Sequence, residues 1–410
     1  MLDFEELRIF VKDEFVISSS DEKYHKFTGN VLDLGVKVGA RTVFIDENGQ
    51  VQTEDLYHPY DELPSSYTNL VFKFVEHGGA LKPHILLKCS PAKIFQGHNV
   101  FGSDNIKQAT IEMLGLLATT HPQLYDILDI STAQIVNLDV TYSARLDNDT
   151  LVCKVLDYLR NVSNGSLRKS KMVYGSTVYW GSPNSKRLAR KAYCKSIEYQ
   201  HQLKKLKQRA RRGEAFAQRV IDAMNDNRIQ QYMVGLLRLE TRFKPVWLHE
   251  NGIAINVWQL IQQQQNEPDL LTRIWKKANA PLFEALKGAE MKYKDDDSLL
   301  QTFRDKLKTV TAKGKPSYTK ANNAFNFYCL LREFGWESVK QRHTEATFYR
   351  NVAAITQCGF DKGFLQNLHT EQHGQVIPFM KFVEIDFNNQ CPDWWREPVS
   401  QFDKPNLRVA

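Results

Sequence analysis

The stretch TVYWGSPNSKRLARKAYCKSIEYQHQ, residues 177–202, decides how the rest of this 410-residue chain is interpreted. It opens with an aromatic and β-branched run, turns at Gly-Ser-Pro-Asn-Ser and enters a second run, a pattern typical of two strands joined by a turn. Because side chains alternate between the faces of a strand, Lys191, Tyr193 and Lys195 are expected on one face, with Glu198 further on. A tyrosine between two lysines suits a phenol that attacks a phosphate. It equally suits the solvated face of an ordinary sheet.

Two further runs alternate in the same way. Residues 134–143, QIVNLDVTYS, place Asp139 on a polar face, and residues 236–243, LLRLETRF, place Glu240 on another. If these runs and the strand of Tyr193 are neighbours in one antiparallel sheet, two carboxylates lie beside the phenol. Carboxylate oxygens are ligands that Mg²⁺ and Mn²⁺ prefer. The alternative is that each polar face simply meets solvent, as in any amphipathic strand.

A histidine lies in a segment that reads as a loop, SPAKIFQGHNVFG, at residues 90–102. A lone loop histidine such as His98 is more often a surface or capping residue than a ligand. Its imidazole nevertheless makes it a candidate metal ligand.

The chain becomes basic after the aromatic run at residues 177–180. Between residues 186 and 212 there are eleven Lys and Arg residues and a single acidic residue, Glu198. This bias exceeds that of an ordinary solvated helix and favours contact with a phosphate backbone. The candidate DNA-contacting residues are Lys186, Arg187, Arg190, Lys191, Lys204 and Lys205.

Composition places the chain among soluble intracellular proteins. The formal net charge is +7, which favours a polyanionic partner without requiring one. Six cysteines are scattered without a C-x-x-C pair, which argues against a zinc ribbon and a disulfide framework and suits a reducing cytoplasm. The acidic start does not resemble a secretory signal, and no apolar run approaches the roughly twenty residues of a membrane span.

Length predicts two or three domains. Residues 41–53 read as a hairpin around Asn-Gly, and residues 106–118 as a helix capped by Asn105 or Asp104. A Gln-rich junction begins near residue 259, and the sequence beyond it is mostly helical. We therefore expect an α+β catalytic domain over residues 1–258, with an antiparallel sheet and helices on one side. A mostly helical C-terminal domain follows over residues 259–410.

Several common catalytic motifs are missing from the sequence. It contains no Walker A loop, no G-x-S-x-G, no H-E-x-x-H and no G-x-G-x-x-G in a βαβ context. Nucleotide hydrolysis and serine hydrolase chemistry therefore find no support.

Long motifs spread over the whole chain resemble the replication initiator proteins of filamentous bacteriophages. They are SPAKIFQGHNVFG, LRNVSNG, ARKAYCKSIEYQHQ, GLLRLETRFK and CPDWWREPV. A weaker similarity to rolling-circle plasmid initiators runs through Y-W-G-S-x-x-S followed by Y-x-K-x-x-E.

The resemblance implies a Mg²⁺-dependent enzyme that nicks and rejoins DNA at the phage origin, in the cytoplasm of the bacterial host. Such proteins cut the viral strand, stay attached to the 5′ phosphate through a tyrosine and leave a 3′ hydroxyl for the host polymerase, with a host helicase as a further partner. They later reseal the displaced strand into a circle without ATP. The attacking tyrosine of the family corresponds to Tyr193, with Lys195 beside it, and Tyr179 is the second candidate.

The sequence departs from the wider rolling-circle pattern in one respect. Those enzymes bind metal through a His-x-His motif, and none occurs here. The candidate ligands are therefore Asp139 and Glu240, with His98 and Glu198 as additions. The family also makes a shorter protein from an internal start, for which Met291 is the candidate here.

Two other functions remain open from the sequence. A non-catalytic regulator would bind origin DNA through the basic helix and a C-terminal helix-turn-helix, and would need neither metal nor phenol. A tyrosine recombinase would use a phenol without metal. It would also need convergent Arg, His and Arg residues before its tyrosine, and the last tyrosine, Tyr349, has no such setting.

Overall fold

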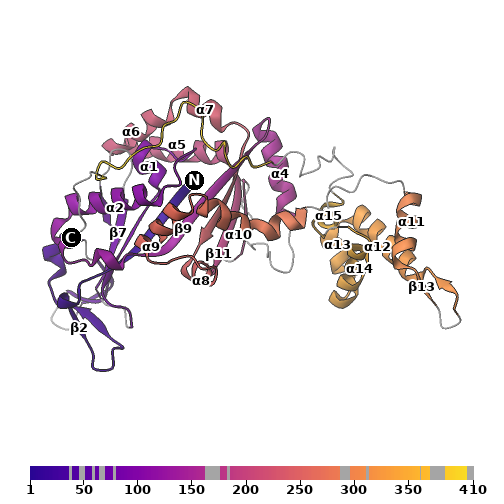
Figure 1. Ribbon diagram of the computed structural model, residues 1–410, viewed down its shortest axis with the longest axis horizontal. Helices are drawn as coiled ribbons and strands as arrows, with labels where there is room; N and C mark the ends of the chain where they lie inside the picture. The colour runs from indigo at the N-terminus through magenta and orange to yellow at the C-terminus, as the bar shows by residue number, and fades with distance from the viewer. Residues whose placement is uncertain are drawn as a thin grey trace.

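The chain forms a large antiparallel sheet flanked by helices, followed by a smaller helical part (Figure 1). The computed structural model describes residues 1–36, 39–45, 51–57, 61–63, 70–76, 80–161, 176–181, 185–286, 296–310, 314–360, 362–369 and 384–403. The predicted α+β class is confirmed. Met291 and the predicted turn at residues 47–50 lie outside the described residues.

Among the described residues the main sheet has eight strands, and each neighbouring pair is antiparallel. The strands that carry Tyr193, Glu240 and Asp139 are consecutive in this sheet, so the condition under which the sequence would place both carboxylates beside the phenol is met. The sheet order is β10 (Thr177–Trp180), β11 (Leu188–Cys194), β12 (Leu236–Phe243), β9 (Gln134–Arg145), β1 (Leu2–Phe10), β8 (His84–Cys89), β7 (Leu70–Val75) and β6 (Asp61–Leu63).

The register of these strands sets which side chains meet. Lys191 on β11 lies opposite Glu240 on β12, and Arg242 on β12 lies opposite Asp139 on β9. Side chains that face each other across an antiparallel pair share one face of the sheet and lie within contact distance. Two acids and two bases are therefore brought to one face by backbone pairing alone.

Shorter elements extend the N-terminal part. The hairpin predicted at residues 41–53 is confirmed, since Val43 pairs with Thr53. Three short 3-10 helices occur among the described residues, at Asp13–Phe15, Val31–Leu34 and Ile130–Thr132. The additional two-stranded pairs are β2 (Val16–Ser18) with β3 (His25–Phe27), β4 (Gly39–Ile45) with β5 (Val51–Tyr57), and β13 (Thr309–Val310) with β14 (Pro316–Ser317).

Helices cover both faces of the main sheet, so the prediction of helices on one side is wrong. On one face, α1 (Pro91–Gln96) and α5 (Lys195–Arg211) line a pocket together with strand residues. On the other face, the ring of Trp275 in α10 (Leu270–Leu286) lies 5.3 Å from that of Tyr142 on β9. The other helices of this part are α2 (Ile106–Thr120), α3 (Pro122–Asp126), α4 (Asp149–Asn161), α6 (Ala215–Met224), α7 (Asn227–Met233), α8 (Pro245–Glu250) and α9 (Val257–Asn266).

The segment expected as a loop at residues 90–102 contains a helix. Pro91 occupies the first turn of α1, where its missing N–H is not needed, and the helix ends at Gly97 with a φ of 81°. The next helix matches its prediction, because the side chain of Asn105 accepts a hydrogen bond of 3.1 Å from the backbone N–H of Gln108.

The Gln-rich segment expected as a junction is helix α9, capped by Asn256. Its apolar side chains, Val257, Leu260 and Ile261, are buried in the same core as the strands of the main sheet. This core also includes Trp275 of α10. Packing of the sheet therefore continues past residue 258, while the division into residues 1–258 and 259–410 stays a prediction.

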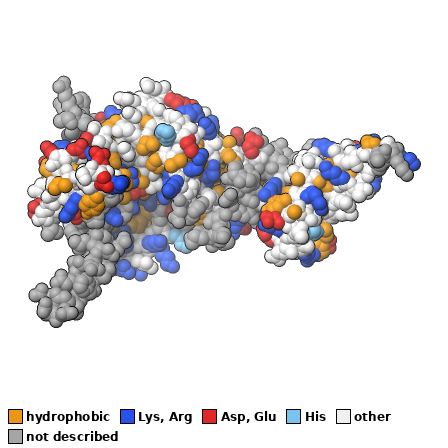
Figure 2. Space-filling view, turned by 90° about the horizontal axis from the view of Figure 1, so that it is seen from below, with side chains coloured by type: hydrophobic (Ala, Val, Ile, Leu, Met, Phe, Trp, Pro, Cys, Tyr) orange, Lys and Arg blue, Asp and Glu red, His pale blue; other side chains and the backbone are white. Residues whose placement is uncertain are grey.

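The C-terminal part is helical, as predicted, and encloses a separate core around Phe303, Phe348 and Leu365. Figure 2 shows Lys and Arg side chains distributed over this part of the surface, at the right end of the molecule. Its helices are α11 (Asp296–Leu307), α12 (Thr319–Phe334), α13 (Trp336–Gln341), α14 (Glu345–Gln357) and α15 (Lys362–Asn367).

The last described segment, residues 384–403, returns to the sheet. The side-chain amide of Gln390 pairs with the backbone of Ser143 on β9, accepting at 2.8 Å and donating at 3.0 Å. Further along, the hydroxyl of Ser400 donates at 2.8 Å to the buried carboxylate of Glu112 on α2. The tail is therefore part of the N-terminal fold although it follows the helical part in sequence.

A search of the described residues for a membrane span finds no helix that is both long and apolar enough to cross a bilayer.

One buried acid in the fold is unconnected with the predicted site. Glu5 on β1 is fully buried, and one of its oxygens accepts a hydrogen bond of 2.9 Å from the hydroxyl of Thr110 on α2. Its other oxygen, Oε2, is buried without a hydrogen-bond partner in the described part of the chain. Burial raises the pKa of Glu5 to about 8, so this carboxyl is protonated in the folded protein at neutral pH.

We expect Glu5→Gln to stabilise the protein progressively as the pH rises from 4.5 to about 8. The folded wild type binds one more proton than the unfolded chain in this window, so its unfolding free energy falls by up to about 1.4 kcal/mol per pH unit. Urea unfolding of both proteins at several pH values measures the difference. The control is Glu337→Gln on the surface of α13. A difference between Glu5→Gln and wild type that does not vary with pH would contradict this assignment.

Candidate active site

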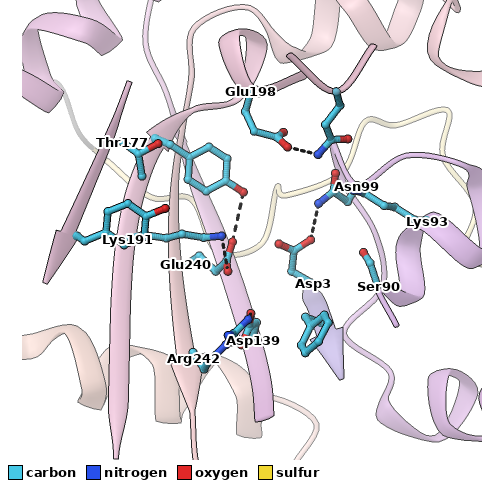
Figure 3. Close-up of a pocket in the computed structure, with 14 residues that line it drawn as sticks. Asp3, Ser90, Lys93, Asn99, Asp139, Thr177, Lys191, Glu198, Glu240 and Arg242 are labelled. Carbon is cyan, nitrogen blue, oxygen red and sulfur yellow. Dashed lines mark hydrogen bonds and ion pairs between the residues drawn. The ribbon is translucent and has the colours of Figure 1, made fainter. Parts of the chain in front are cut away.

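The predicted site residues surround a pocket of about 280 Å³ on one face of the main sheet. Strands β1, β9, β10, β11 and β12 form its floor, while α1 and α5 form its walls. In Figure 3, Lys191 and Glu240 lie together on one side, with Asp3 and Asn99 on the other. The lining residues are Asp3, Phe4, Ser90, Lys93, Asn99, Asp139, Thr177, Tyr179, Lys191, Tyr193, Glu198, Gln202, Glu240 and Arg242.

Tyr193 lies at the end of β11 and is almost fully buried, yet it lines the pocket. Its hydroxyl donates a hydrogen bond of 3.3 Å to Oε2 of Glu240. The other oxygen of Glu240, Oε1, lies 2.8 Å from Nζ of Lys191 and forms an ion pair with it. This ammonium lies 5.2 Å from the centre of the Tyr193 ring. A phenol, a carboxylate and an ammonium are thus held in mutual contact.

The surroundings of Glu240 disfavour its charge. Burial raises the pKa of Glu240 to about 8, with Lys191 opposing the increase and the negative charges of Asp3 and Asp139 adding to it. Burial, followed by the charge of Glu240, raises the pKa of Tyr193 well above its ordinary value. Glu240 is therefore mostly protonated at neutral pH, and it becomes a proton acceptor in contact with the phenol as the pH rises through about 8.

The opposite side of the pocket keeps a carboxylate charged. Burial opposes ionisation of Asp3, but the positive charges of Arg238 and Lys195 lower its pKa to about 2. The side-chain amide of Asn99 donates to Asp3 at 2.8 Å, and its carbonyl oxygen accepts at 2.8 Å from Nζ of Lys195. The buried guanidinium of Arg238 donates to the backbone carbonyls of Asn99 and Val100, which fixes this loop against the sheet.

Two models of the phage replication-associated protein family match the chain, the N-terminal model over residues 1–264 and the C-terminal model over residues 310–401. The chain belongs to this replication-associated protein family. The sequence is 34% identical to the replication-associated protein of Salmonella phage IKe over 99% of each chain. It is 33% identical to the replication-associated proteins of Enterobacteria phages M13 and fd, over 89% of this chain and 90% of theirs. No solved structure matches.

Family membership confirms the resemblance seen in the sequence motifs and supports a role in bacteriophage DNA replication. The region covered by the N-terminal family model contains every residue that lines the pocket.

Lys195 does not occupy the position that strand alternation predicted. Strand β11 ends at Cys194, and Lys195 is the first residue of α5. Its side chain is fully buried and forms an ion pair of 2.6 Å with Glu198, three residues further along the helix. Burial lowers the pKa of Lys195 to about 8. In this member of the replication-associated protein family, Lys195 thus contacts Asn99 and Glu198 behind the pocket wall, and it does not line the pocket beside Tyr193.

Three of the four candidate metal ligands line the pocket, and each has a cationic partner. Both oxygens of Asp139 accept from Arg242, at 2.7 and 2.6 Å, while Glu240 is paired with Lys191 and Glu198 with Lys195. The fourth, His98, does not line the pocket.

His98 is buried with its ring 4.8 Å from that of Phe101. Its Nδ1 accepts a hydrogen bond of 3.3 Å from the backbone N–H of Val100. Burial, together with the charges of Lys195 and Arg238, lowers the pKa of His98 to about 4, so the imidazole is neutral.

The described residues contain no group of three or more His, Cys, Asp or Glu side chains arranged to hold a metal ion. This does not conflict with magnesium, which commonly takes one or two protein carboxylates and completes its shell with water and substrate phosphate. Asp3 and Glu240 both line the pocket, and the charge of Asp3 raises the pKa of Glu240. A divalent cation between such carboxylates would relieve this repulsion, so the donor set fits the predicted metal.

The six basic residues predicted to contact DNA divide into three groups. Lys204 and Lys205 are exposed on α5, and Lys186 and Arg187 are exposed before β11, where Arg187 pairs with Glu250 at 2.5 Å. Lys191 lines the pocket. Arg190 contacts the backbone carbonyl of Ala278 on the opposite face of the sheet.

Sequence patterns did not identify Asp3 and Asn99. Asp3 belongs to the run LDFEELRIF, in which acidic residues interrupt an apolar strand, and this signal points to acids within the sheet. Asn99 is the neighbour of His98 in the Gly-His-Asn segment. The sequence singled out His98 in this segment, whereas the side chain that reaches the pocket is the amide of Asn99.

We expect Lys191→Met to raise the pKa of Glu240 above about 8, because the substitution removes the cation that opposes protonation while keeping most of the side-chain volume. Carboxyl ¹³C titration of protein labelled at glutamate measures this pKa, and Glu240→Gln assigns the resonance by removing it. A Glu240 that titrates near 4.5 in the wild type would contradict the electrostatic description of the pocket.

Proposed function

We propose that the protein is a DNA strand transferase in which Tyr193 attacks a phosphodiester at the phage origin and forms a covalent 5′-phosphotyrosine. The observation that carries this proposal is the contact of the Tyr193 hydroxyl with Glu240, beside Lys191, in a pocket open to a ligand. A phenol needs a base to become a nucleophile and a positive charge to stabilise the phosphate that it attacks. Glu240 and Lys191 supply these two groups.

The proposed cleavage conserves one phosphodiester bond. The phenolic oxygen of Tyr193 bonds to phosphorus, its proton passes to Glu240, and the P–O3′ bond breaks. The departing 3′ oxygen takes a proton from solvent and becomes a free hydroxyl. In joining, a 3′ hydroxyl attacks the phosphotyrosine and Tyr193 regains its proton, so no nucleotide is consumed.

Lys191 has a different partner before and after DNA binds in this scheme. Before DNA binds, its ammonium is paired with Glu240. A phosphate in the pocket would share that ammonium, and the carboxylate would lose part of its compensating charge. Its affinity for the phenolic proton would then increase, because removal of a nearby cation favours the neutral carboxyl.

A bound Mg²⁺, with Mn²⁺ as a substitute, would act as a Lewis acid on a phosphate oxygen. The carboxylates available to hold it are Asp3, Asp139 and Glu240, and Glu198 is a further candidate on the α5 wall. His98 is a poor candidate, because it lies outside the pocket lining and its Nδ1 is already an acceptor.

The cellular role that we propose is initiation of rolling-circle replication in the cytoplasm of the bacterial host. Its substrates would be supercoiled origin DNA and the displaced single strand, which it would cleave and rejoin into a circle. The 3′ hydroxyl would pass to host DNA polymerase, and a host helicase would separate the strands. This proposal rests on membership of the replication-associated protein family and on the pocket of Tyr193. Self-association on DNA is a further expectation for the C-terminal part.

We expect Tyr193→Phe to abolish both nicking of supercoiled origin DNA and covalent attachment, because phenylalanine has no oxygen to bond to phosphorus. Agarose gels of the plasmid and denaturing gels of the protein–DNA adduct measure the two results. Tyr179→Phe is the matched control, since Tyr179 also lines the pocket, and it should retain both activities.

An adduct that persists in Tyr193→Phe and disappears in Tyr179→Phe would transfer the nucleophile to Tyr179. A wild type that binds origin DNA in Mg²⁺ but never changes its topology would favour the non-catalytic regulator instead.

We expect Glu240→Gln to lower the single-turnover cleavage rate by about 10²–10⁴-fold, the contribution of a positioned general base. The wild-type rate should increase as the pH rises through about 8, where Glu240 becomes ionised, and this increase should disappear in the variant. Origin binding by the variant, measured in parallel, shows that it is folded. A variant that keeps the wild-type pH profile would exclude Glu240 as the base.

A further inference from the structure

A second pocket, of about 460 Å³, lies on the face of the sheet opposite Tyr193. Arg190 and Lys191 are consecutive residues of β11, and consecutive strand side chains point to opposite faces. Lys191 lines the pocket of Tyr193, whereas Arg190 lines the second pocket together with residues of α8 and α10. Its lining residues are Gly181, Ser185, Arg187, Leu188, Arg190, Trp247, Asn251, Lys277, Ala278 and Pro281.

The charge of the second pocket is opposite to that of the first. Arg187, Arg190 and Lys277 line it, and no Asp or Glu is among its described lining residues. The described lining of the pocket of Tyr193 contains four carboxylates. The second pocket is therefore suited to an anion, whereas the first is suited to a cation held near the phosphate.

Its cations keep the capacity to bind a ligand. Arg190 donates from Nε and Nη2 to the carbonyl of Ala278, at 3.0 and 2.5 Å, and its Nη1 forms no hydrogen bond with the described residues. The ammonium of Lys277 is exposed and forms no ion pair within the described ranges. Arg187 forms two contacts with the carboxylate of Glu250, at 2.6 and 2.5 Å, and its side chain remains 59% exposed beside the pocket.

The remaining wall of the pocket is apolar. Leu188, Trp247 and Pro281 contribute to it, and the side chain of Asn251 is fixed there by a hydrogen bond of 2.8 Å to the carbonyl of Trp247. Pro281 lies within α10 and has no N–H to donate to the carbonyl of Lys277, one turn earlier in the helix. A volume of this size falls within the range of small-molecule sites, which combine apolar walls with a few convergent polar groups.

We propose that this second pocket binds a nucleoside monophosphate unit, with the phosphate against Arg187, Arg190 and Lys277 and the base or sugar against Trp247 and Pro281. Two sources share this chemistry: one nucleotide of a DNA strand that passes around the sheet edge, or a free nucleotide. The site uses none of the groups assigned to the chemistry of strand transfer. Binding of a free nucleotide does not depend on the proposed function, whereas binding of a DNA strand rests on the DNA substrate proposed above.

The test is calorimetric titration of the full-length protein with three probes: 5′-dTMP, inorganic phosphate and the oligonucleotide (dT)8. We expect 5′-dTMP to bind the wild type, and Lys277→Met to weaken that binding by at least about tenfold, as for loss of a charged hydrogen bond. Lys276→Met is the matched control on the same helix, because Lys276 does not line the pocket, and it should bind like the wild type.

The three probes separate the sources of the ligand. A (dT)8 that binds more tightly than 5′-dTMP and loses affinity in Lys277→Met assigns the pocket to a DNA strand. A 5′-dTMP that binds while (dT)8 does not compete with it assigns the pocket to a free nucleotide.

Two results would overturn the proposal: equal affinities of Lys277→Met and wild type, or inorganic phosphate that binds as tightly as 5′-dTMP. Binding of 5′-dTMP to the wild type and to Lys277→Met is measured without any cleavage assay, and Lys277 does not line the pocket of Tyr193. Failure of the strand-transfer proposal and failure of this one are therefore distinguishable.

Discussion

The register of β11 against β12 is the constraint on which both pockets depend. It places Lys191 directly opposite Glu240 and brings Tyr193 to the same face of the sheet. Because side chains alternate with a period of two, a slip of one residue would bring Arg190 to that face and send the phenol to the other. The same register therefore gives one strand two chemically different sides, an acidic pocket with a phenol and a basic pocket without carboxylates among its described lining residues.

Neighbouring charges give two buried carboxylates of the first pocket, Asp3 and Glu240, different pKa values. Asp3 lies near Arg238 and Lys195, which hold its pKa at about 2, whereas Glu240 is surrounded by Lys191 and two other carboxylates and has a pKa of about 8. Environments that push the pKa values of neighbouring acids apart are typical of sites in which one acid stays charged and another transfers a proton. Glu240, which contacts the phenol, is the one suited to proton transfer, and Asp3 is the one suited to hold positive charge.

The sequence predicted β9 and β12 well because these strands are long and their apolar and polar residues alternate, as at residues 236–243. The strand prediction failed at Lys195, because the strand ends at Cys194 and a helix begins at the next residue. The three-residue spacing of Lys195 and Glu198 is a helical signal, which the interpretation of this segment as a strand overlooks. Asp3 could not be predicted as a site residue because alternation does not give the order of strands in a sheet. Asp3, at the start of the chain, lies on the same pocket as Glu240 only because β1 is placed between β9 and β8 in the sheet.

The C-terminal tail shows why a linear division of this chain is incomplete. The indole of Trp395 donates at 2.9 Å to Gln96, and the amide of Gln96 donates at 2.6 Å to the carbonyl of Phe101. These bonds hold both ends of the loop from which Asn99 reaches Asp3 and Lys195. Trp395, which follows the whole helical part in sequence, thus supports the loop that forms a wall of the first pocket. Any truncation within the helical part would remove this support together with the helices, so loss of activity in such a fragment would not by itself assign a catalytic role to them.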